Sequence, residues 1–272
     1  MALITVLGAA GFIGTHLVKR IEDLGFDCFA PGREDDLTAR SLGQVIYAIG
    51  LTADFRTRPF ETVEGHVCKL ADVLRSCDFD SLVYLSSTRV YRGGVKTVHE
   101  DDEVVASPRN ADQLYNISKV MGESLGLASG KNVRVARLSN VYGADFGSGN
   151  FLAVVIREAL TDGKVTLKTS IESDKDYVSI DDVVELLIKI ATSGKEKIYN
   201  VASGRNVLNA EIATRLKQIT GCAVEVVPEA PTTSFPRISI DRVVNEFDFK
   251  PRYVLDDLEH LVELYKNESA RG

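Results

Sequence analysis

The sequence predicts an α/β protein in which a parallel sheet is covered by helices on both faces. Short, continuous apolar segments alternate with longer segments in which apolar residues recur at helical spacing. This is the pattern of parallel strands joined by crossover helices. A glycine-rich turn also joins the first apolar segment to the first helical one. With 272 residues, of which 44% are hydrophobic, the chain can bury a substantial core.

The first half of the chain shows the clearest alternation. Ile13, Leu17 and Ile21 lie on one helical stripe, and Gly25 ends that helix. Few residues separate the second expected strand from the next one, so the third of the usual six strands is expected to be missing or abbreviated. The expected strands are Leu3–Leu7, Phe26–Ala30, Gln44–Ile49, Ser81–Ser86 and Val133–Leu138, and the expected helices are Phe12–Leu24, Val63–Arg75 and Asp112–Ser129.

After Tyr142 the pattern loosens. Glycine and polar residues from Gly143 to Asn150 predict a loop. The acidic pair Asp181 and Asp182 suits the start of a helix. The remaining expected elements are helices Phe151–Leu160 and Asp181–Thr192, strands Lys164–Lys168 and Lys197–Val201, and three helices after Ala210, with the proline-containing stretch Pro228–Pro236 between the first two.

Composition and charge exclude several classes of protein. The net charge of −7 gives no electrostatic reason to expect binding to nucleic acid or to an anionic membrane. No apolar run approaches the roughly 20 residues that span a bilayer, and no basic region precedes the apolar start. A cytoplasmic protein is therefore expected, with no metal site and with four reduced, widely spaced thiols at Cys28, Cys68, Cys77 and Cys222.

Gly8, Gly11 and Gly14 form a turn directly after the first expected strand. Glycine lets the backbone turn tightly and approach a pyrophosphate, and the positive end of the following helix favours the negative charge. The turn therefore predicts a dinucleotide site that includes Phe12 and Ile13. The alternative is a glycine-rich turn without a ligand.

The end of the second expected strand bears on the kind of dinucleotide. Gly32 stands where an acidic residue usually contacts the ribose. Arg33 follows directly and could pair with a 2′-phosphate, whereas Glu34 and Asp35 could still reach a 2′-hydroxyl. We therefore favour NADP over NAD, with a solvated loop charge as the alternative reading of Arg33.

Tyr115 and Lys119 lie four residues apart on an expected helix, so both side chains share one face. A lysine ammonium beside the phenol is expected to lower its pKa toward the range useful for proton transfer. Such a pair alone is common on helix surfaces. Ser87, at the end of the strand Ser81–Ser86, adds a hydroxyl at the edge of the sheet where ligands bind in this class of fold.

Together these segments resemble the NAD-dependent epimerase/dehydratase family, the extended short-chain dehydrogenase/reductases. The resemblance covers nearly the whole chain and implies a Rossmann-type doubly wound parallel sheet with a smaller C-terminal α/β substrate-binding lobe. It implies an NAD(P)-binding domain at residues 1–145 plus about 176–204, and a substrate-binding lobe at about 146–175 plus 205–272. The matching segments are Gly8–Gly14, Ser86–Tyr91, Tyr115–Lys119, Arg137–Gly143, Lys175–Val183, Tyr199–Gly204 and Phe247–Pro251.

The resemblance also implies roles for single residues. Tyr115 would be the acid/base, Lys119 its partner and a cofactor contact, and Ser87 the catalytic hydroxyl. The other implied contacts are Ala48 and Val141 with the cofactor, and Thr88, Asn140 and Arg237 with a nucleotide sugar. Two departures matter: Thr62 replaces an asparagine common near the cofactor, and Arg89 and Val90 follow Thr88 where the family's dehydratases carry an acid and a base.

These features predict an NAD(P)-dependent oxidoreductase acting on a nucleotide-diphosphate sugar, in the first place a 4-keto-sugar reductase. A 4-epimerase that retains NAD is the alternative, and a catalytically silent cofactor-binding protein is the alternative from another class. A homodimer is expected through helices Val63–Arg75 and Asp112–Ser129, as the family implies. His66 and Lys69 interrupt the apolar face of the first of these helices, so a monomer is the alternative to the dimer.

Overall fold

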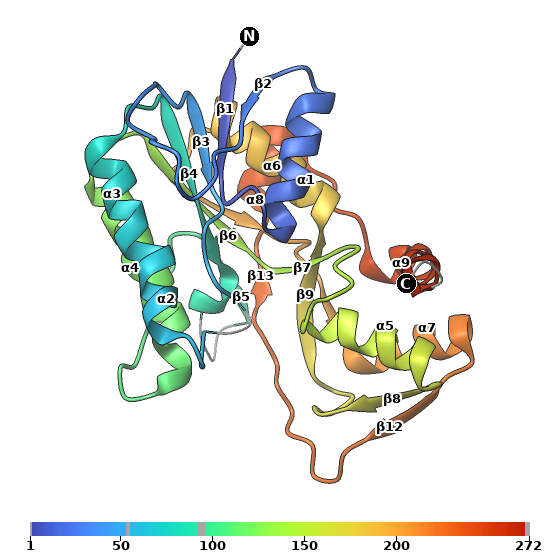
Figure 1. Cartoon of the computed structure of the whole chain (residues 1–272). Coiled ribbons are helices and arrows are strands. Elements are labelled where there is room, and N and C mark those ends of the chain that lie inside the picture. The colour runs from blue at the N-terminus through green and yellow to red at the C-terminus, as the bar shows by residue number, and fades with distance from the viewer. Residues whose placement is uncertain (1, 53–54, 92–95, 270–272) are drawn as a thin grey trace.

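The computed structural model describes residues 2–52, 55–91 and 96–269. Its centre is a six-stranded, wholly parallel sheet with the strand order β10-β6-β4-β3-β1-β2 (Figure 1). Because all six strands run the same way, their carboxyl ends lie along one edge of the sheet. The strands are β1 (Leu3–Leu7), β2 (Asp27–Phe29), β3 (Gln44–Tyr47), β4 (Ser81–Ser87), β6 (Val133–Leu138) and β10 (Ile198–Val201).

Helices cover both faces of this sheet, which confirms the doubly wound fold (Figure 1). Consecutive residues of β3 go to opposite faces: Ile46 packs into the core beside α1, and Val45 and Tyr47 pack into the core beside α3. One layer consists of α1 (Phe12–Asp23) and α6 (Ile180–Ser193); the other consists of α2 (Pro59–Val63), a π-helical segment η1 (Glu64–Cys68), α3 (Lys69–Ser76) and α4 (Leu114–Ala128).

The abbreviation expected after the second strand is present. Residues 30–43, between β2 and β3, contain no helix or strand, and β3 pairs directly with β1. Strand β2 is shorter than predicted, at three residues. The helix expected from Val63 begins four residues earlier, at Pro59, because proline suits the first turn of a helix, where its missing N–H leaves no bond unmade.

The elements α2, η1 and α3 form one continuous helical segment over the face of the sheet that carries Tyr84. Its middle part, η1, is a π turn. Two buried tyrosines of the sheet hold it: the Tyr47 hydroxyl donates to the Gly65 carbonyl at 2.7 Å, and the Tyr84 hydroxyl donates to the His66 carbonyl at 3.1 Å. His66 is completely buried, so our expectation that it interrupts an exposed face is wrong. This side chain lies inward against α4, where its Nδ1 atom is 2.8 Å from the Ser118 hydroxyl.

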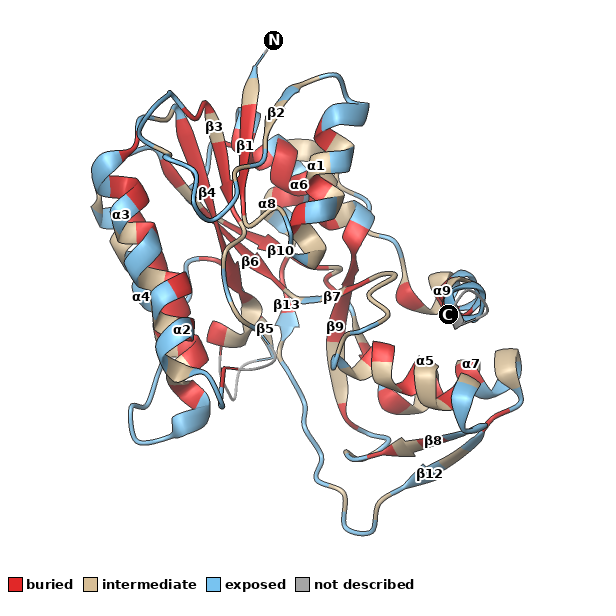
Figure 2. Ribbon diagram, viewed as in Figure 1, coloured by how far each residue is buried: buried red, intermediate tan, exposed pale blue. Residues whose placement is uncertain are grey.

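The C-terminal region has its own apolar core, in which Ile156, Leu216 and Leu258 are fully buried. Figure 2 shows buried residues on both α5 and α7, and α5 contacts α7 and β8. Three helices follow Ala210 as expected, and the loop at residues 143–150 is also present. The elements are α5 (Phe151–Thr161), β8 (Lys164–Leu167), α7 (Asn209–Thr220), β12 (Ala223–Val226), α8 (Asp241–Phe247) and α9 (Val254–Ser269).

Several short strands were not expected from the sequence. They form a three-stranded sheet of order β11-β9-β7, a pair of β12 with β8, and a pair of β13 with β5. Most are two to four residues long and carry polar side chains, so they lack the apolar run that marks a strand. The strands other than β12 are β5 (Thr97–Val98), β7 (Asn140–Tyr142), β9 (Asp174–Ser179), β11 (Asn206–Leu208) and β13 (Arg237–Ile238).

The four cysteines have free thiols, as expected. Within the described ranges no group of three or more His, Cys, Asp or Glu side chains is arranged to hold a metal ion. None of the helices in those ranges combines the length and apolarity needed to cross a bilayer.

Candidate active site

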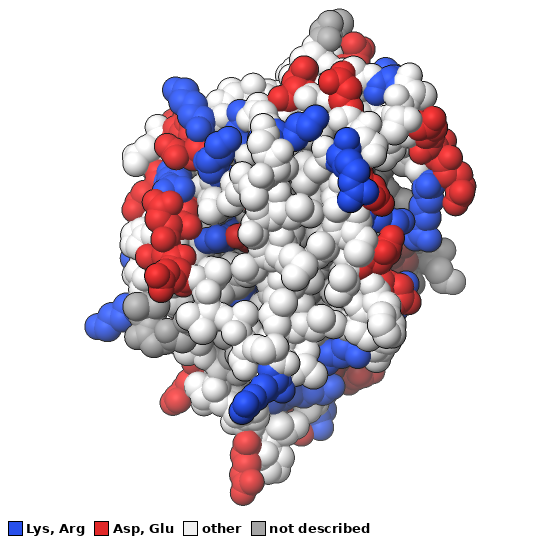
Figure 3. Space-filling view, turned by 90° about the vertical axis from the view of Figure 1, so that its left-hand side faces the viewer, with Lys and Arg blue, Asp and Glu red and all other residues white. Residues whose placement is uncertain are grey.

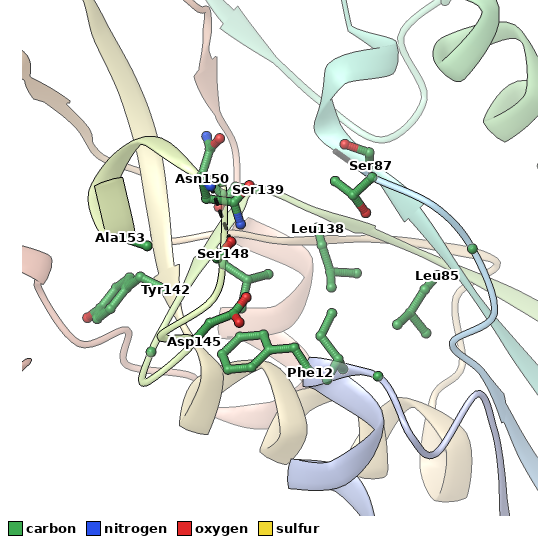
Figure 4. A pocket seen from close by; sticks show the side chains of 18 of the residues that line it. Phe12, Leu85, Ser87, Leu138, Ser139, Tyr142, Asp145, Ser148, Asn150 and Ala153 are labelled. Carbon is green, nitrogen blue, oxygen red and sulfur yellow. Dashed lines mark hydrogen bonds between the residues drawn. The ribbon is translucent and has the colours of Figure 1, made fainter. Parts of the chain in front are cut away.

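A cavity of about 740 Å³ lies at the carboxyl edge of the sheet, within the usual size range of ligand sites. Strand ends form one wall, and the loop before α5 together with α5 forms the other. Figure 4 shows Leu85 and Ser87 on one side of this space, and Tyr142 and Ala153 on the other. The predicted site residues that line it are Gly11, Phe12, Ile13, Gly14, Ala48, Ser87, Thr88, Tyr115, Lys119, Asn140 and Val141.

The three glycines of the turn serve different purposes. Gly8 has a φ of +93°, and a Cβ on Gly14 would lie 2.2 Å from the Gly8 carbonyl oxygen, so the packing of the turn itself requires both glycines. A Cβ on Gly11 would lie no closer than 3.4 Å to that oxygen. Gly11 lines the cavity where α1 begins and offers no side chain to cap that end. The turn therefore leaves the start of α1 open to a phosphate group, as a dinucleotide requires.

Tyr115 and Lys119 lie one turn apart on α4, and both side chains are buried. The Lys119 ammonium donates a 2.8 Å hydrogen bond to the Leu85 carbonyl, near the end of β4. The Tyr115 hydroxyl is hydrogen-bonded with the side chains of Ser87 and Thr52. The structure therefore brings the predicted tyrosine, lysine and serine together.

The electrostatics differ from the expectation. Burial raises the pKa of Tyr115 above its usual value, and this outweighs the opposing effects of Ser87, Arg89 and Thr52. Lys119 does not lower it, because its Nζ atom lies 5.9 Å from the centre of the Tyr115 ring and bonds the backbone instead. Burial lowers the pKa of Lys119 itself to about 7. The phenol is therefore in its neutral form, which suits a proton donor.

Arg89 and Lys175 are two of the cations that line the cavity and that our sequence reasoning did not assign to the site. The Arg89 guanidinium lies 5.0 Å from the centre of the Tyr115 ring. The Lys175 ammonium lies 4.6 Å from the centre of the Phe151 ring, and burial together with the positive charge of Arg89 lowers its pKa. Two cations close enough to repel each other favour an anionic ligand.

Sequence signals for both cations existed. Arg89 follows the strand-end hydroxyls at Ser87 and Thr88, and Lys175 opens one of the matching segments. The sequence did not indicate that β9 places Lys175 in the same cavity as Arg89. Phe55, Arg56 and Thr52 were missed for a different reason, because they come from a segment with no periodic pattern.

Some predicted residues do not line the cavity. Gly8 supports the turn from behind, and Arg33 lies exposed in the segment after β2. Arg237 is also exposed, and its Nε atom donates to the Gly204 carbonyl at 2.8 Å, because β13 pairs with β5 away from the cavity. Thr62 is buried, and its hydroxyl donates within its own helix, to the Arg58 carbonyl.

A buried ion pair supports α4 from behind. Arg137 of β6 donates to the Glu123 carboxylate of α4 at 2.7 Å, and both side chains are nearly inaccessible. The Ser86 hydroxyl donates to the same carboxylate, and Arg137 also donates to the Tyr91 hydroxyl at 2.8 Å. These bonds fix α4 against β4 and β6, and removal of one buried partner would leave an uncompensated charge.

Relatives were found for almost the whole chain. The dTDP-4-dehydro-6-deoxy-D-allose reductase of Streptomyces bikiniensis is 23% identical, over 98% of this chain and 97% of that protein. A putative UDP-glucose 4-epimerase of Methanocaldococcus jannaschii is also 23% identical, over 98% and 99%. Among solved structures, MoeE5 in complex with UDP-glucose and NAD has a TM-score of 0.80 at 21% identity, covering 99% of this chain and 100% of its own. RMD from Pseudomonas aeruginosa complexed with NADPH has a TM-score of 0.81 at 21% identity, over 98% and 100%.

The fold, the cavity and these relatives together define an α/β enzyme of the NAD(P)-dependent kind. The profile of the NAD dependent epimerase/dehydratase family matches residues 4–202, which is most of the chain. The protein therefore belongs to this family, as the sequence motifs indicated.

Proposed function

We propose that the protein is a reductase of 4-keto-sugar nucleotides that uses NADPH. The observation that supports this most is the neutral, buried Tyr115 phenol, hydrogen-bonded with Ser87 and Thr52 in a cavity that the glycine turn also lines. The bound cofactor would supply hydride to the keto carbon. Tyr115 would donate its proton to the oxygen of that carbon, and Ser87 would hold the same oxygen by hydrogen bonding.

The residues that would hold the cofactor form one end of the cavity. Gly11, Phe12 and Ile13 at the start of α1 would take the pyrophosphate, Val141 would lie near the nicotinamide, and Ala48 would also contact the cofactor. Lys119 would contact the nicotinamide ribose. The preference for NADP over NAD depends on Arg33, which lies outside the cavity but is exposed and close to the end of β2.

The residues that would hold the nucleotide sugar lie toward the C-terminal region. We assign Lys175 and Arg89 to its negative charges, because both are cations that line the cavity and neither is among the proposed cofactor contacts. Asn140 and Thr88 would contact the sugar. Arg237, expected to bind the diphosphate, is replaced in this proposal by Lys175.

A 4-epimerase that retains NAD remains the second candidate, and one relative bears that description. A catalytically silent cofactor-binding protein is a third. Mass spectrometry of the ligands released from purified protein separates them. A site that is empty or carries NADP, together with NADPH oxidation on a 4-keto-sugar nucleotide, supports the reductase. Retained NAD with interconversion of two epimers contradicts it, and bound cofactor without any turnover indicates the silent protein.

The division into two domains is also a proposal. The large sheet takes its strands from residues 3–138 and 198–201, which fits an NAD(P)-binding domain of residues 1–145 plus about 176–204. The separate apolar core around α5, α7 and α9 fits a substrate-binding lobe of about 146–175 plus 205–272. The cavity between them is lined by residues of both. Limited proteolysis that released neither part as a stable fragment would count against this division.

We further propose a homodimer through the face formed by α2, α3 and α4. Figure 3 shows a broad band without charged side chains on the side of the molecule where these helices lie, with charged side chains on both flanks. Phe60 of α2 and Met121 and Leu127 of α4 are exposed, and Ile117, Val120 and Leu125 line a shallow groove together with Met121. A single sedimenting species near 29.7 kDa at micromolar concentration would exclude the dimer.

A further inference from the structure

Helix α9 is hydrogen-bonded to the wall of the cavity at two points. Residues 142–146, which we call the wall segment, run from the end of β7 into the loop before α5. Tyr142 and Asp145 of this segment line the cavity. Figure 4 shows Tyr142 with its hydroxyl directed away from Leu85 and Ser87, which lie across the cavity. The polar end of this tyrosine is therefore directed toward groups outside the cavity.

The first contact joins Tyr142 to a carboxylate of α9. The Tyr142 hydroxyl donates a 2.7 Å hydrogen bond to the Asp257 carboxylate. Arg252, which lies just before the helix, donates to the two oxygens of that carboxylate at 2.8 and 2.6 Å. The backbone N–H of Arg252 also donates to the carboxylate of Asp182, near the start of α6, at 2.8 Å. One chain of hydrogen bonds therefore connects the wall segment, α9 and α6.

Asp257 serves in this chain as a charged acceptor. Its side chain is only 14% exposed. Burial alone would raise the pKa of this carboxyl, but the hydrogen bonds from Arg252 and Tyr142 outweigh burial, so its pKa lies below the usual value. Hydrogen bonds to an ionised acceptor are stronger than those between neutral groups. The bond from Tyr142 to α9 is therefore of the stronger, charge-assisted kind.

The second contact lies two turns further along α9. Tyr265 follows Asp257 by eight residues, so the two side chains share one face of the helix. The Tyr265 hydroxyl donates a 3.0 Å hydrogen bond to the Asp145 carbonyl, and its ring meets the Phe146 ring edge-on with centres 4.9 Å apart. One face of α9 therefore holds the wall segment at both ends.

Between these two contacts the wall segment touches the starts of two other helices. The backbone of Gly143 packs so closely on Phe12 and Ile180 that a Cβ at this position would come within 3.0 Å of the first side chain and 2.7 Å of the second. Phe12 and Ile180 are the first residues of α1 and α6. Since Phe12 also lines the cavity, a shift of the wall segment changes the surface that the start of α1 offers to a ligand.

We propose that α9 positions the wall segment against the start of α1, with Asp257, acting through Tyr142, as the positioning residue. The choice of a nicotinamide dinucleotide as the affected ligand rests on the proposed function, whereas the positioning itself is a property of the free protein. Chains of hydrogen-bonded and packed side chains carry energetic coupling between separated groups, and single substitutions in them change an affinity about 2- to 30-fold.

The test compares three substitutions in the full chain. Tyr142→Phe removes the hydroxyl but leaves the ion pair of Asp257 with Arg252. Asp257→Ala removes the acceptor, whereas Asp257→Asn keeps an amide oxygen that can accept from Tyr142. Fluorescence titration gives the Kd for NADPH or NADH, whichever the wild type binds more tightly. This Kd should rise about 2- to 30-fold in Tyr142→Phe and Asp257→Ala, and stay near the wild-type value in Asp257→Asn.

Hydrogen–deuterium exchange, followed by mass spectrometry, reports on the wall segment in the free protein. Peptides that cover residues 142–146 should exchange faster in Tyr142→Phe and Asp257→Ala, because the segment loses an anchor. Glu259→Ala is the matched control, since Glu259 lies on the same helix but its 2.9 Å ion pair with Arg215 joins α9 to α7. The control should leave both the exchange of the wall segment and the cofactor affinity unchanged.

Unchanged exchange of the wall segment in Tyr142→Phe would overturn the proposal, and so would an unchanged cofactor affinity. An equal loss of affinity in Glu259→Ala would also overturn it, because the effect would then be one of general stability. If Asp257→Ala does not fold, Tyr142→Phe decides the matter, since it leaves the ion pair in place. If the wild type binds neither dinucleotide, the proposed function fails, and the exchange comparison alone decides whether α9 positions the wall segment.

Discussion

The proposed cofactor end and the proposed substrate end of the cavity are made from different kinds of residue. At the cofactor end, the backbone and small or apolar side chains form the surface, and Gly8 and Gly14 are fixed by contacts within the turn itself. At the substrate end, long side chains from separate segments converge: Phe55, Arg89 and Lys175. The surface at the cofactor end depends on local geometry, which a short contiguous stretch of sequence determines. The surface at the substrate end depends on how distant segments meet.

Tyr115 lies where the two ends meet, so its removal should have the largest effect. Tyr115→Phe should reduce turnover about 10²- to 10⁴-fold, the usual cost of losing an acid/base group. Affinity for the cofactor should remain, because the glycine turn is untouched. NADPH fluorescence measures binding and steady-state assays measure turnover. Near-normal turnover in this variant would refute the assignment of the acid/base.

Lys175→Gln tests the substrate end alone. Loss of a charge-assisted contact of about 1.5–3 kcal/mol should raise KM for the nucleotide sugar roughly 10- to 100-fold, with the cofactor affinity unchanged. Lys168→Gln, at an exposed position just after β8, is the control and should behave as wild type. Equal losses of cofactor and substrate affinity in Lys175→Gln would mean that the two ends are not separate.

Gly11→Ala and Gly14→Ala test the cofactor end, with smaller expected effects. A methyl group on Gly14 collides with the Gly8 carbonyl, so the free energy of unfolding should fall by about 1–3 kcal/mol. A methyl group on Gly11 meets no such contact and faces the cavity, so stability should hold while cofactor affinity falls about tenfold. Thermal melts and cofactor titrations of both variants provide the comparison. If both variants melt alike, the division of roles within the turn is wrong.

The difference between surfaces formed by contiguous sequence and surfaces formed by distant segments also explains which parts of the fold and of the candidate site could be predicted from the sequence. The six main strands, the glycine turn and the Tyr115/Lys119 pair follow from apolar runs and short spacings, and the structure contains them all. Arg237 was expected at the diphosphate and does not line the cavity, because the pairing of β13 with β5 is a long-range event that no local pattern records. The inward position of His66 also escaped prediction, because no local pattern indicates the π turn in which it lies.

The electrostatic expectation was wrong for a related reason. An i, i+4 spacing places Lys119 near Tyr115, but spacing does not state the burial of either group. In the folded protein burial dominates both pKa values, raising that of the tyrosine and lowering that of the lysine. The roles assigned to the individual site residues stay predictions until the variants above are measured.

The position of β10 has a consequence for how the protein is made. This strand closes the edge of the large sheet beside β6, yet it comes from residues 198–201, after a long excursion of the chain. While a ribosome is still producing the intervening segment, the edge of β6 has no partner strand, and an unpaired edge is a template for another chain. A nascent or truncated product ending near residue 145 would therefore be prone to aggregate, and a chaperone that shields strand edges would raise its yield more than that of the full-length protein.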